Sequence, residues 1–263
     1  MRDLTVQIQM ISKQKIDLVR SLKDHKERQK SGLFVAEGSK LVLDLLKTAL
    51  IPAEVFVTAD GISAFDANSS RIEVIRISDK EMERISSFKN PSSVLALFRI
   101  PSIDPVTEKS FRGVNLVLDK IQDPGNLGTI VRTADWFGIS RIFCSPDCAD
   151  LYNPKCVQST MGALARVQIH YLDLATVLKE ASNLQIPVYG AYMEGESVFE
   201  RELSTKALIV MGSEGQGISP ELRPFLTKKI SIPSYPASSR ELESLNVAVS
   251  AAIICAEFRR RMI

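Results

Sequence analysis

The sequence predicts an α/β protein of two domains, the second built on a parallel sheet. Short apolar segments that suit buried strands alternate with segments of helical spacing, and a polar segment with two prolines divides this alternation in two. Alternating strands and helices favour a parallel sheet covered by helices on both faces. The 263 residues suit one large domain or two small ones, and the dividing segment favours two.

A basic helix is predicted over residues 13–30. Apolar Ile16, Val19 and Leu22 recur at helical spacing, and the basic side chains of the segment are expected to face outward. The first 30 residues hold 8 basic and 4 acidic residues. Such a face suits either a solvated helix or contact with nucleic-acid phosphates, and the residues alone leave both possibilities open.

The rest of residues 1–105 predicts a small α/β domain. Strands are expected over 33–36, 54–57, 73–77 and 94–98, and helices over 38–49 and 78–85. Ser78 or Asp79 suits the N-cap of the second of these helices, because either side chain can accept from the free N–H groups of a first turn. Residues 101–110 are polar with two prolines, which indicates a linker that extends to about residue 112.

The second domain is predicted over residues 113–263. Strands are expected over 114–119, 141–144, 187–192, 207–211 and 229–233, and helices over 127–137, 153–164, 174–184 and 245–261. Gly138 suits a left-handed position that ends the first of these helices, and Pro154 suits a first helical position. Ligands of parallel sheets bind beyond the carboxyl ends of the strands, so chemistry is expected there.

The composition excludes several classes of protein. No apolar run approaches the ~20 residues of a membrane helix, and the first residues lack the apolar stretch of a secretory signal, so a cytoplasmic protein is expected. With only two histidines, His25 and His170, neither a histidine-based metal site nor a Ser-His-Asp triad is expected. The four cysteines fit neither a disulfide framework nor a zinc site, so free thiols and no metal are expected. They are Cys144, Cys148, Cys156 and Cys255.

The first segment with a chemical signal runs from Asp119 to Asp135, where a strand ends, a Pro-Gly turn follows and a helix begins. Asn126 stands at the helix entrance, where its side chain can cap the helix or reach a ligand. Arg132 follows by six residues, less than two helical turns. Alternatively, Asn126 could be only a helix cap and Arg132 only a surface residue. The dinucleotide fingerprint G-x-G-x-x-G is absent here.

Two further segments place polar groups after strands. In Gly-Ser-Glu-Gly-Gln-Gly, an apolar strand leads into three glycines around Glu214, with no Walker lysine after them. Farther on, a strand ending in Ile232 and a polar loop lead to Ser244 and Asn246, which open a helix of small apolar residues. Helix N-termini offer free N–H groups to polar ligands, although Ser244 alone would suit a plain N-cap.

Taken together and in this order, the three segments resemble the SpoU branch of the SPOUT methyltransferases. These enzymes transfer a methyl group from S-adenosylmethionine to a ribose 2′-hydroxyl of tRNA or rRNA. The matching runs are Asp-Pro-Gly-Asn-Leu-Gly-x-x-x-Arg-Thr-Ala, Gly-Ser-Glu-Gly-Gln-Gly-Ile, and Ile-Pro followed by Ser-Leu-Asn-Val-Ala-Val. The run Gly32 to Gly38 is also similar to the small RNA-binding domain that many members carry ahead of the catalytic one.

The resemblance implies a deep trefoil knot in the second domain, a homodimer with active sites at or near the subunit interface, and an RNA partner. It places functional positions on Arg132, Asn126, Glu214, Ser244 and Asn246. It places cofactor contacts, largely backbone atoms, on Gly212, Ile232, Leu245 and Gly217. S-adenosylmethionine is already an activated methyl donor, so no metal is needed.

Arg132 is the family's proposed base or orienting group. Free arginine stays protonated, with a pKa above ~12. We therefore favour the hypothesis that Arg132 binds the adjacent phosphate and positions the hydroxyl, while a base role would need strong perturbation by a neighbour. Two departures from the family pattern stand out: Gly125 replaces a frequent His, and the segment from Ile232 to Leu245 is longer than usual.

Two different functions compete with this one. A non-catalytic RNA-binding relative could keep the same fold, but the joint presence of the five functional positions argues against it. A nucleotide-binding α/β enzyme of another kind would need a phosphate-binding fingerprint. The formal charge of +2 divides into +3 over residues 1–112 (18 basic, 15 acidic) and −1 over 113–263 (15 basic, 16 acidic). The basic excess thus falls on the domain expected to hold RNA.

Overall fold

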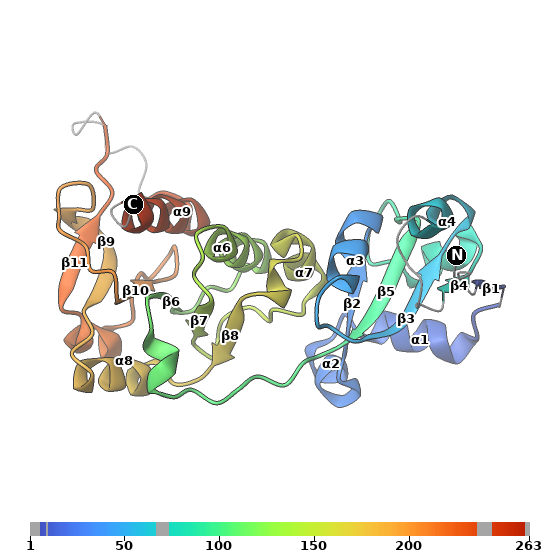
Figure 1. The fold of residues 1–263 in the computed structure, drawn as a ribbon, viewed down its shortest axis with the longest axis horizontal. Coiled ribbons are helices and arrows are strands. Elements are labelled where there is room, and N and C mark those ends of the chain that lie inside the picture. The colour runs from blue at the N-terminus through green and yellow to red at the C-terminus, as the bar shows by residue number, and fades with distance from the viewer. Residues whose placement is uncertain (1–5, 9, 67–73, 236–243, 261–263) are drawn as a thin grey trace. The chain divides into compact units, whose positions relative to one another are not determined.

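The computed structural model describes residues 6–8, 10–66, 74–235 and 244–260, which divide into two compact units (Figure 1). Unit 1 comprises residues 1–102 and 152–165, and unit 2 comprises residues 103–151 and 166–263. Segment 152–165 therefore belongs structurally with the first unit, because helix α7 (Pro154–Thr160) packs against strand β2 (Leu33–Glu37). No helix among the described residues is long and apolar enough to cross a membrane.

Unit 1 is built on a mixed five-stranded sheet. Its order is β1 (Val6–Ile8), β4 (Val74–Arg76), β3 (Pro52–Val57), β5 (Val94–Arg99) and β2, with β5 antiparallel to both of its neighbours. The helices before residue 103 are α1 (Lys13–Ser21), α2 (His25–Ser31), α3 (Ser39–Leu46), α4 (Ala59–Asp66) and α5 (Asp79–Ile85). Ser78 caps α5 in a capping box with Glu81, as the sequence predicts.

The single helix predicted over residues 13–30 is wrong, because the structure has two helices there. The side chain of Asp24 accepts from the amide of Lys26 and so starts α2, after α1 has ended at Ser21. The apolar residues at helical spacing are nevertheless buried in the core, as expected; they are Ile16, Val19 and Leu22. The outward direction expected of the basic side chains is wrong for Arg28, which is buried and donates to the carbonyls of Leu22 and Lys23. It is also wrong for Lys15, which is half-buried and pairs with Glu54.

Unit 2 is built on a six-stranded sheet in which all strands are parallel, which confirms the predicted parallel sheet. The order is β11 (Lys228–Ser231), β9 (Val188–Ser197), β10 (Ala207–Met211), β6 (Val114–Leu118), β7 (Arg141–Cys144) and β8 (Gln168–Tyr171). Helices α6 (Pro124–Trp136) and α9 (Val247–Arg260) lie together on one face, and α8 (Leu174–Asn183) lies on the other (Figure 1). Short 3-10 helices cover Glu108–Phe111 (η1), Ala163–Ala165 (η2) and Pro220–Phe225 (η3).

Several element ends differ from the sequence prediction for local reasons. Helix α6 begins at Pro124 rather than at residue 127, because Asp123 caps it. The helix predicted over 153–164 stops at Thr160, where Met161 turns left-handed with φ +49°. The left-handed Gly138 and the initial Pro154 are confirmed. Strand β1 and helix α4 have no counterpart among the sequence predictions.

The topology brings three segments to one edge of the second sheet. Strands β6 and β10 pair in register from Ala207 opposite Val114 to Met211 opposite Leu118, so their carboxyl ends lie side by side. The residues that follow β6, β10 and β11 are those of the three sequence motifs. Parallel strand direction thus explains why motifs separated by about a hundred residues in the chain can form one site.

Candidate functional site

Three predicted site residues from three different segments meet at the carboxyl edge of the second sheet. The side-chain amide of Asn126, in the first turn of α6, donates to Glu214 Oε1 at 3.2 Å. The side-chain amide of Asn246, just before α9, donates to the same oxygen at 2.9 Å and to Asn126 Oδ1 at 3.0 Å. We call these residues the Asn126–Glu214–Asn246 network.

The network also completes the beginning of helix α9. The backbone N–H of Val247 donates to Glu214 Oε1 at 3.2 Å, and Asn246 Oδ1 accepts from Ala248 N at 3.0 Å and from Val249 N at 3.3 Å. Asn246 is therefore the N-cap, and the N-cap role considered for Ser244 is wrong. A carboxylate at the positive end of a helix dipole is favourable, so Glu214 stabilises the start of α9.

The glycines around Glu214 have a steric reason. A Cβ atom at Gly212 would overlap the backbone of Gly217, and Gly217 itself is left-handed with φ +66°. The turn is closed by the Gly217 amide, which donates to the Ser213 carbonyl at 2.8 Å. The Gly-Ser-Glu-Gly-Gln-Gly run thus forms a tight loop after β10 that carries Glu214 at its exposed side.

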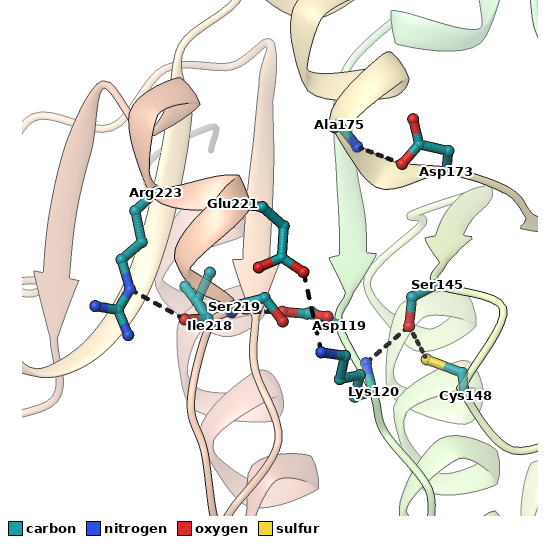
Figure 2. A network of polar contacts seen from close by, with 10 residues as sticks. All are labelled: Asp119, Lys120, Ser145, Cys148, Asp173, Ala175, Ile218, Ser219, Glu221 and Arg223. Carbon is teal, nitrogen blue, oxygen red and sulfur yellow. Dashed lines mark hydrogen bonds and ion pairs between the residues drawn. The ribbon is translucent and has the colours of Figure 1, made fainter.

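Asp119, at the end of β6, fixes the far end of this loop. Its buried carboxylate accepts from the amide of Ser219 at 2.7 Å (Figure 2). Its own amide donates to the Met211 carbonyl at 2.9 Å. Both ends of the loop that carries Glu214 are therefore tied to the end of one neighbouring strand. A buried carboxylate that lost this partner would be costly, which holds the loop in place.

The residue after Asp119 has an unusual backbone. Lys120 is left-handed with φ +57°, a conformation that costs a residue with a Cβ atom roughly 1 to 2 kcal/mol. Its amide donates to Ser145 Oγ at 2.9 Å, and the next amide, of Ile121, donates to Cys148 Sγ at 3.3 Å. Hydrogen bonding with the Cys144 side chain lowers the pKa of the Cys148 thiol to about 7, against the effect of burial.

A pocket of about 330 Å³ opens beside the network. Its lining comes from the segment after β6, the first turn of α6, the loop after β10 and the first residue of α9. The lining residues are Lys120, Ile121, Gln122, Asp123, Asn126, Ser213, Glu214, Gly215, Gln216 and Val247. Two members of the network, Asn126 and Glu214, thus face a cavity large enough for part of a nucleotide.

Two predicted site residues stay outside the network. Arg132 lies on α6 and is exposed, and it makes no hydrogen bond or ion pair with the described part of the chain. Ser244 is exposed and precedes the cap Asn246 by two residues. Arg132 follows Asn126 by six residues on the same helix and is not among the residues that line the pocket.

The positions expected to contact a cofactor follow strands at the same edge. Gly212 and Gly217 close the loop after β10, and half-buried Ile232 comes directly after β11. Leu245 precedes the cap of α9 and is 48% exposed. Most of the lengthened stretch between Ile232 and Leu245, residues 236–243, lies outside the described residues.

The histidines and cysteines take no part in the network. His170 in β8 accepts from Arg141 Nε at 3.2 Å, and burial followed by the charge of Arg141 lowers its pKa. All four cysteines are free thiols and buried. Among the described residues, no group of His, Cys, Asp or Glu is arranged to hold a metal ion.

Three supporting residues, Asp119, Lys120 and Ser145, have no counterpart among the predicted site residues. The available signal for the first two was a charged pair directly after a largely apolar strand, at the edge where ligands of parallel sheets bind. Ser145 could not be found in this way, because only the pairing of β6 with β7 brings it to Lys120.

Comparison with known proteins matches both units to described families. The model of the SpoU rRNA Methylase family matches residues 113–256. The model of the MRM3-like substrate binding domain matches residues 13–96. Together the two matches cover most of the chain, and the first covers all three motifs.

One of two named relatives extends along nearly the full length, and the other matches little more than half of the chain. The 23S rRNA guanosine 2′-O-methyltransferase RlmP of Bacillus subtilis is 29% identical over 254 residues, which cover 96% of this chain and 99% of RlmP. The 23S rRNA guanosine 2′-O-methyltransferase RlmB of Neisseria meningitidis is 35% identical over 150 residues, 56% of this chain and 58% of RlmB.

Solved structures show the same arrangement. A structure from Porphyromonas gingivalis, assigned to the TrmH family of RNA methyltransferases, is 39% identical with a TM-score of 0.83, covering 96% of this chain and 100% of that one. An rRNA methyltransferase from Sinorhizobium meliloti, solved with bound AdoMet, is 25% identical with a TM-score of 0.80, covering 98% of this chain and 99% of that one.

Proposed function

The chain belongs to the SpoU rRNA methylase family, and from that premise we propose that it transfers a methyl group from S-adenosylmethionine to a ribose 2′-hydroxyl of RNA. The observation that carries the proposal is the Asn126–Glu214–Asn246 network, because it joins all three motifs beside one pocket. The substrate class is rRNA or tRNA, and the names of RlmP and RlmB favour rRNA.

The residues at the carboxyl edge fit S-adenosylmethionine. Gly215 and Gly217 leave open space where side chains would stand, so a ligand can approach their backbone. Exposed Leu245 and half-buried Ile232 offer apolar contacts of the kind that an adenine ring requires. We assign cofactor binding to Gly212, Gly217, Ile232 and Leu245. When bound, the cofactor supplies a sulfonium-activated methyl group.

The protein's own residues then have to position the ribose and handle its proton. Alignment of reactants alone can contribute roughly 7 to 11 kcal/mol to catalysis. Asn126 is held by Glu214 and Asn246 at the pocket wall, where it can orient the nucleotide. We assign Arg132 to the phosphate beside the target ribose, since this guanidinium is exposed and is not engaged by the described residues. Ser244 is assigned to the same catalytic group.

Unit 1 is proposed to hold the RNA. Its residues 13–96 match a substrate binding domain, and four lysines of α1, α2 and the turn between them are exposed and able to contact phosphates. They are Lys13, Lys23, Lys26 and Lys30. Lys15 is half-buried and paired with Glu54, so we expect it to contribute less to RNA binding than the four exposed lysines.

We further propose a homodimer, formed through α6 and α9, in the cytoplasm. Trp136 on α6 is 83% exposed and Val249 on α9 is 49% exposed, and burying both against a second copy would be favourable. Sedimentation should give twice the chain mass for the wild type and the single mass for Trp136→Glu. The trefoil knot stays a prediction.

Transfer of a tritiated methyl group tests the proposed function. The purified protein and labelled S-adenosylmethionine should label ribosomal RNA from a strain that lacks the gene, and should not label RNA from the parent strain. Ribose-methylation mapping of the two RNAs identifies the nucleotide. Binding of the RNA without transfer would instead identify a non-catalytic relative.

A further inference from the structure

Lys120 stands at the pocket without a role in the network. It follows β6 directly and lines the same cavity as Asn126 and Glu214. Among the described residues that line this pocket, Lys120 is the only cation. The two acidic lining residues are engaged internally: Asp123 accepts from the amide of Asn126 at 2.8 Å, and Glu214 accepts from three donors.

The backbone of Lys120 is fixed in a conformation that lysine does not favour. Its φ of +57° is left-handed, and its own amide donates to Ser145 Oγ in the loop after β7 (Figure 2). The next amide, of Ile121, donates to Cys148 Sγ in the same loop. Backbone strain of this kind is found at functional sites more often than elsewhere. The turn fixes the point from which the lysine side chain leaves the sheet edge.

The charge of Lys120 has only a loose partner. Its Nζ atom lies 4.0 Å from Glu221 Oε1, with 34% of the lysine and 63% of the glutamate side chain exposed (Figure 2). An ion pair at that distance and exposure contributes little. Glu221 can therefore be exchanged for another anion that reaches the pocket.

We propose that Lys120 binds a phosphate of the RNA beside the target nucleotide and releases Glu221 when the RNA arrives. The inference rests on the proposed function, because it takes the pocket as the place of the target nucleotide. It adds a second cation to the side of the pocket formed by β6, while Arg132 acts from α6. Lys120 is a positioning residue and takes no part in proton transfer.

Two alternative roles for Lys120 would give different results. If the Lys120–Glu221 pair were purely structural, removing either partner would have the same effect. If Lys120 instead bound the carboxylate of the cofactor's methionine moiety, its loss would weaken S-adenosylmethionine binding and leave the affinity for RNA unchanged.

The test compares four variants with the wild type. Lys120→Asn removes the charge and keeps a residue type that tolerates the left-handed backbone, and Lys120→Arg keeps the charge. Glu221→Gln removes only the partner. Lys206→Gln is the matched control, because exposed Lys206 precedes β10 at the opposite edge of the sheet. Filter binding of gene-deletion ribosomal RNA is measured across salt concentrations, with S-adenosylmethionine affinity by calorimetry and thermal unfolding for each variant.

We expect Lys120→Asn to weaken RNA binding several-fold and to reduce the slope of log affinity against log salt by about one. KM for RNA should rise with kcat nearly unchanged, Lys120→Arg should restore binding, and Glu221→Gln should not weaken it. An unchanged salt slope in Lys120→Asn, equal losses in Lys120→Asn and Glu221→Gln, or a loss confined to S-adenosylmethionine would each overturn the inference. If the wild type binds RNA in a Lys120-dependent way but transfers no methyl group, the proposed function fails, while the contact of Lys120 with an RNA phosphate is supported.

Discussion

Asn246 donates a 2.9 Å hydrogen bond to Glu214, although 32 residues separate them in the chain. The same carboxylate oxygen accepts from Asn126, 88 residues away from it, and from the amide of Val247. One oxygen thus connects the beginnings of α6 and α9 to the loop after β10. Removing it should affect the site and the helix end together.

Glu214→Ala leaves three donors without their acceptor. We expect kcat for methyl transfer to fall by about 100-fold or more, since a lost preorganised polar group commonly costs that much. The free energy of unfolding should fall by about 1 to 3 kcal/mol, because these donors lose a charged partner. Initial rates and urea unfolding measure the two effects. Glu200→Ala, an exposed carboxylate elsewhere in unit 2, should change neither, and full activity in Glu214→Ala would refute the assigned role.

Arg132→Ala should abolish most methyl transfer while leaving stability within ~0.5 kcal/mol, because the side chain is exposed. Arg132→Lys should recover only part of the rate, since lysine lacks the planar two-point contact with phosphate. Pre-steady-state rates across pH measure both variants. The control is Arg112→Ala, an exposed arginine before β6 at the opposite sheet edge. A near wild-type rate with a flat pH profile in Arg132→Lys would exclude both the base role and the phosphate role.

Neutralising the exposed lysines of α1, α2 and the turn between them tests the RNA-holding role proposed for unit 1. Changing Lys13, Lys23, Lys26 and Lys30 to Gln should weaken RNA binding and flatten its salt dependence. Lys15→Gln alone should have a smaller effect on binding, because Lys15 is paired with Glu54. Filter binding between roughly 50 and 200 mM salt, where phosphate contacts weaken steeply, measures both. An unchanged slope in the fourfold variant would remove these helices from the RNA interface.

Cys148 should make stability depend on pH. Its folded pKa is about 7 and its ordinary value is 9.0, so the unfolded state binds more protons between these values. The contribution of the Cys148 thiolate to the free energy of unfolding is therefore present at high pH and lost as the pH falls through 7. We expect the free energy of unfolding to rise by roughly 1 to 2 kcal/mol from about pH 7.0 to about pH 8.5.

Urea titrations at these two pH values measure the effect. Cys148→Ala should remove most of the rise. Cys255→Ala should retain it, because burial raises the pKa of Cys255 to about 12 and keeps the folded thiol neutral in this range. Equal pH dependence in the wild type and Cys148→Ala would contradict the assignment.

Much of the second unit follows from the sequence because its signals are strong. Strands such as Val114–Leu118 and Ala207–Met211 are largely apolar runs, and Gly138 stops α6 as expected. The helix break at Leu22 to Asp24 is not predicted because apolar spacing continues up to it, while the capping by Asp24 depends on a single side chain. Strand β1 is not predicted because three residues give too short a pattern to detect.

The sequence predicts which residues belong to the site, but it does not predict the hydrogen bonds between them. Asn126, Glu214 and Asn246 are identified by their motifs, but the choice of Asn246 over Ser244 as the N-cap depends on where Glu214 lies. The left-handed turn at Lys120 likewise depends on Ser145 and Cys148, which reach it through strand pairing. Interactions that need a neighbouring strand cannot be seen in a linear pattern.

The all-parallel sheet of unit 2 has a kinetic consequence. Parallel neighbours cannot pair through a short turn, and β6 reaches β10 only after about ninety intervening residues have been arranged. Such non-local pairing slows folding. We expect the Asn126–Glu214–Asn246 network to form last, because it requires both strands and the start of α9. During refolding from urea, methyl transfer should therefore return with the slowest phase, after helical signal has recovered.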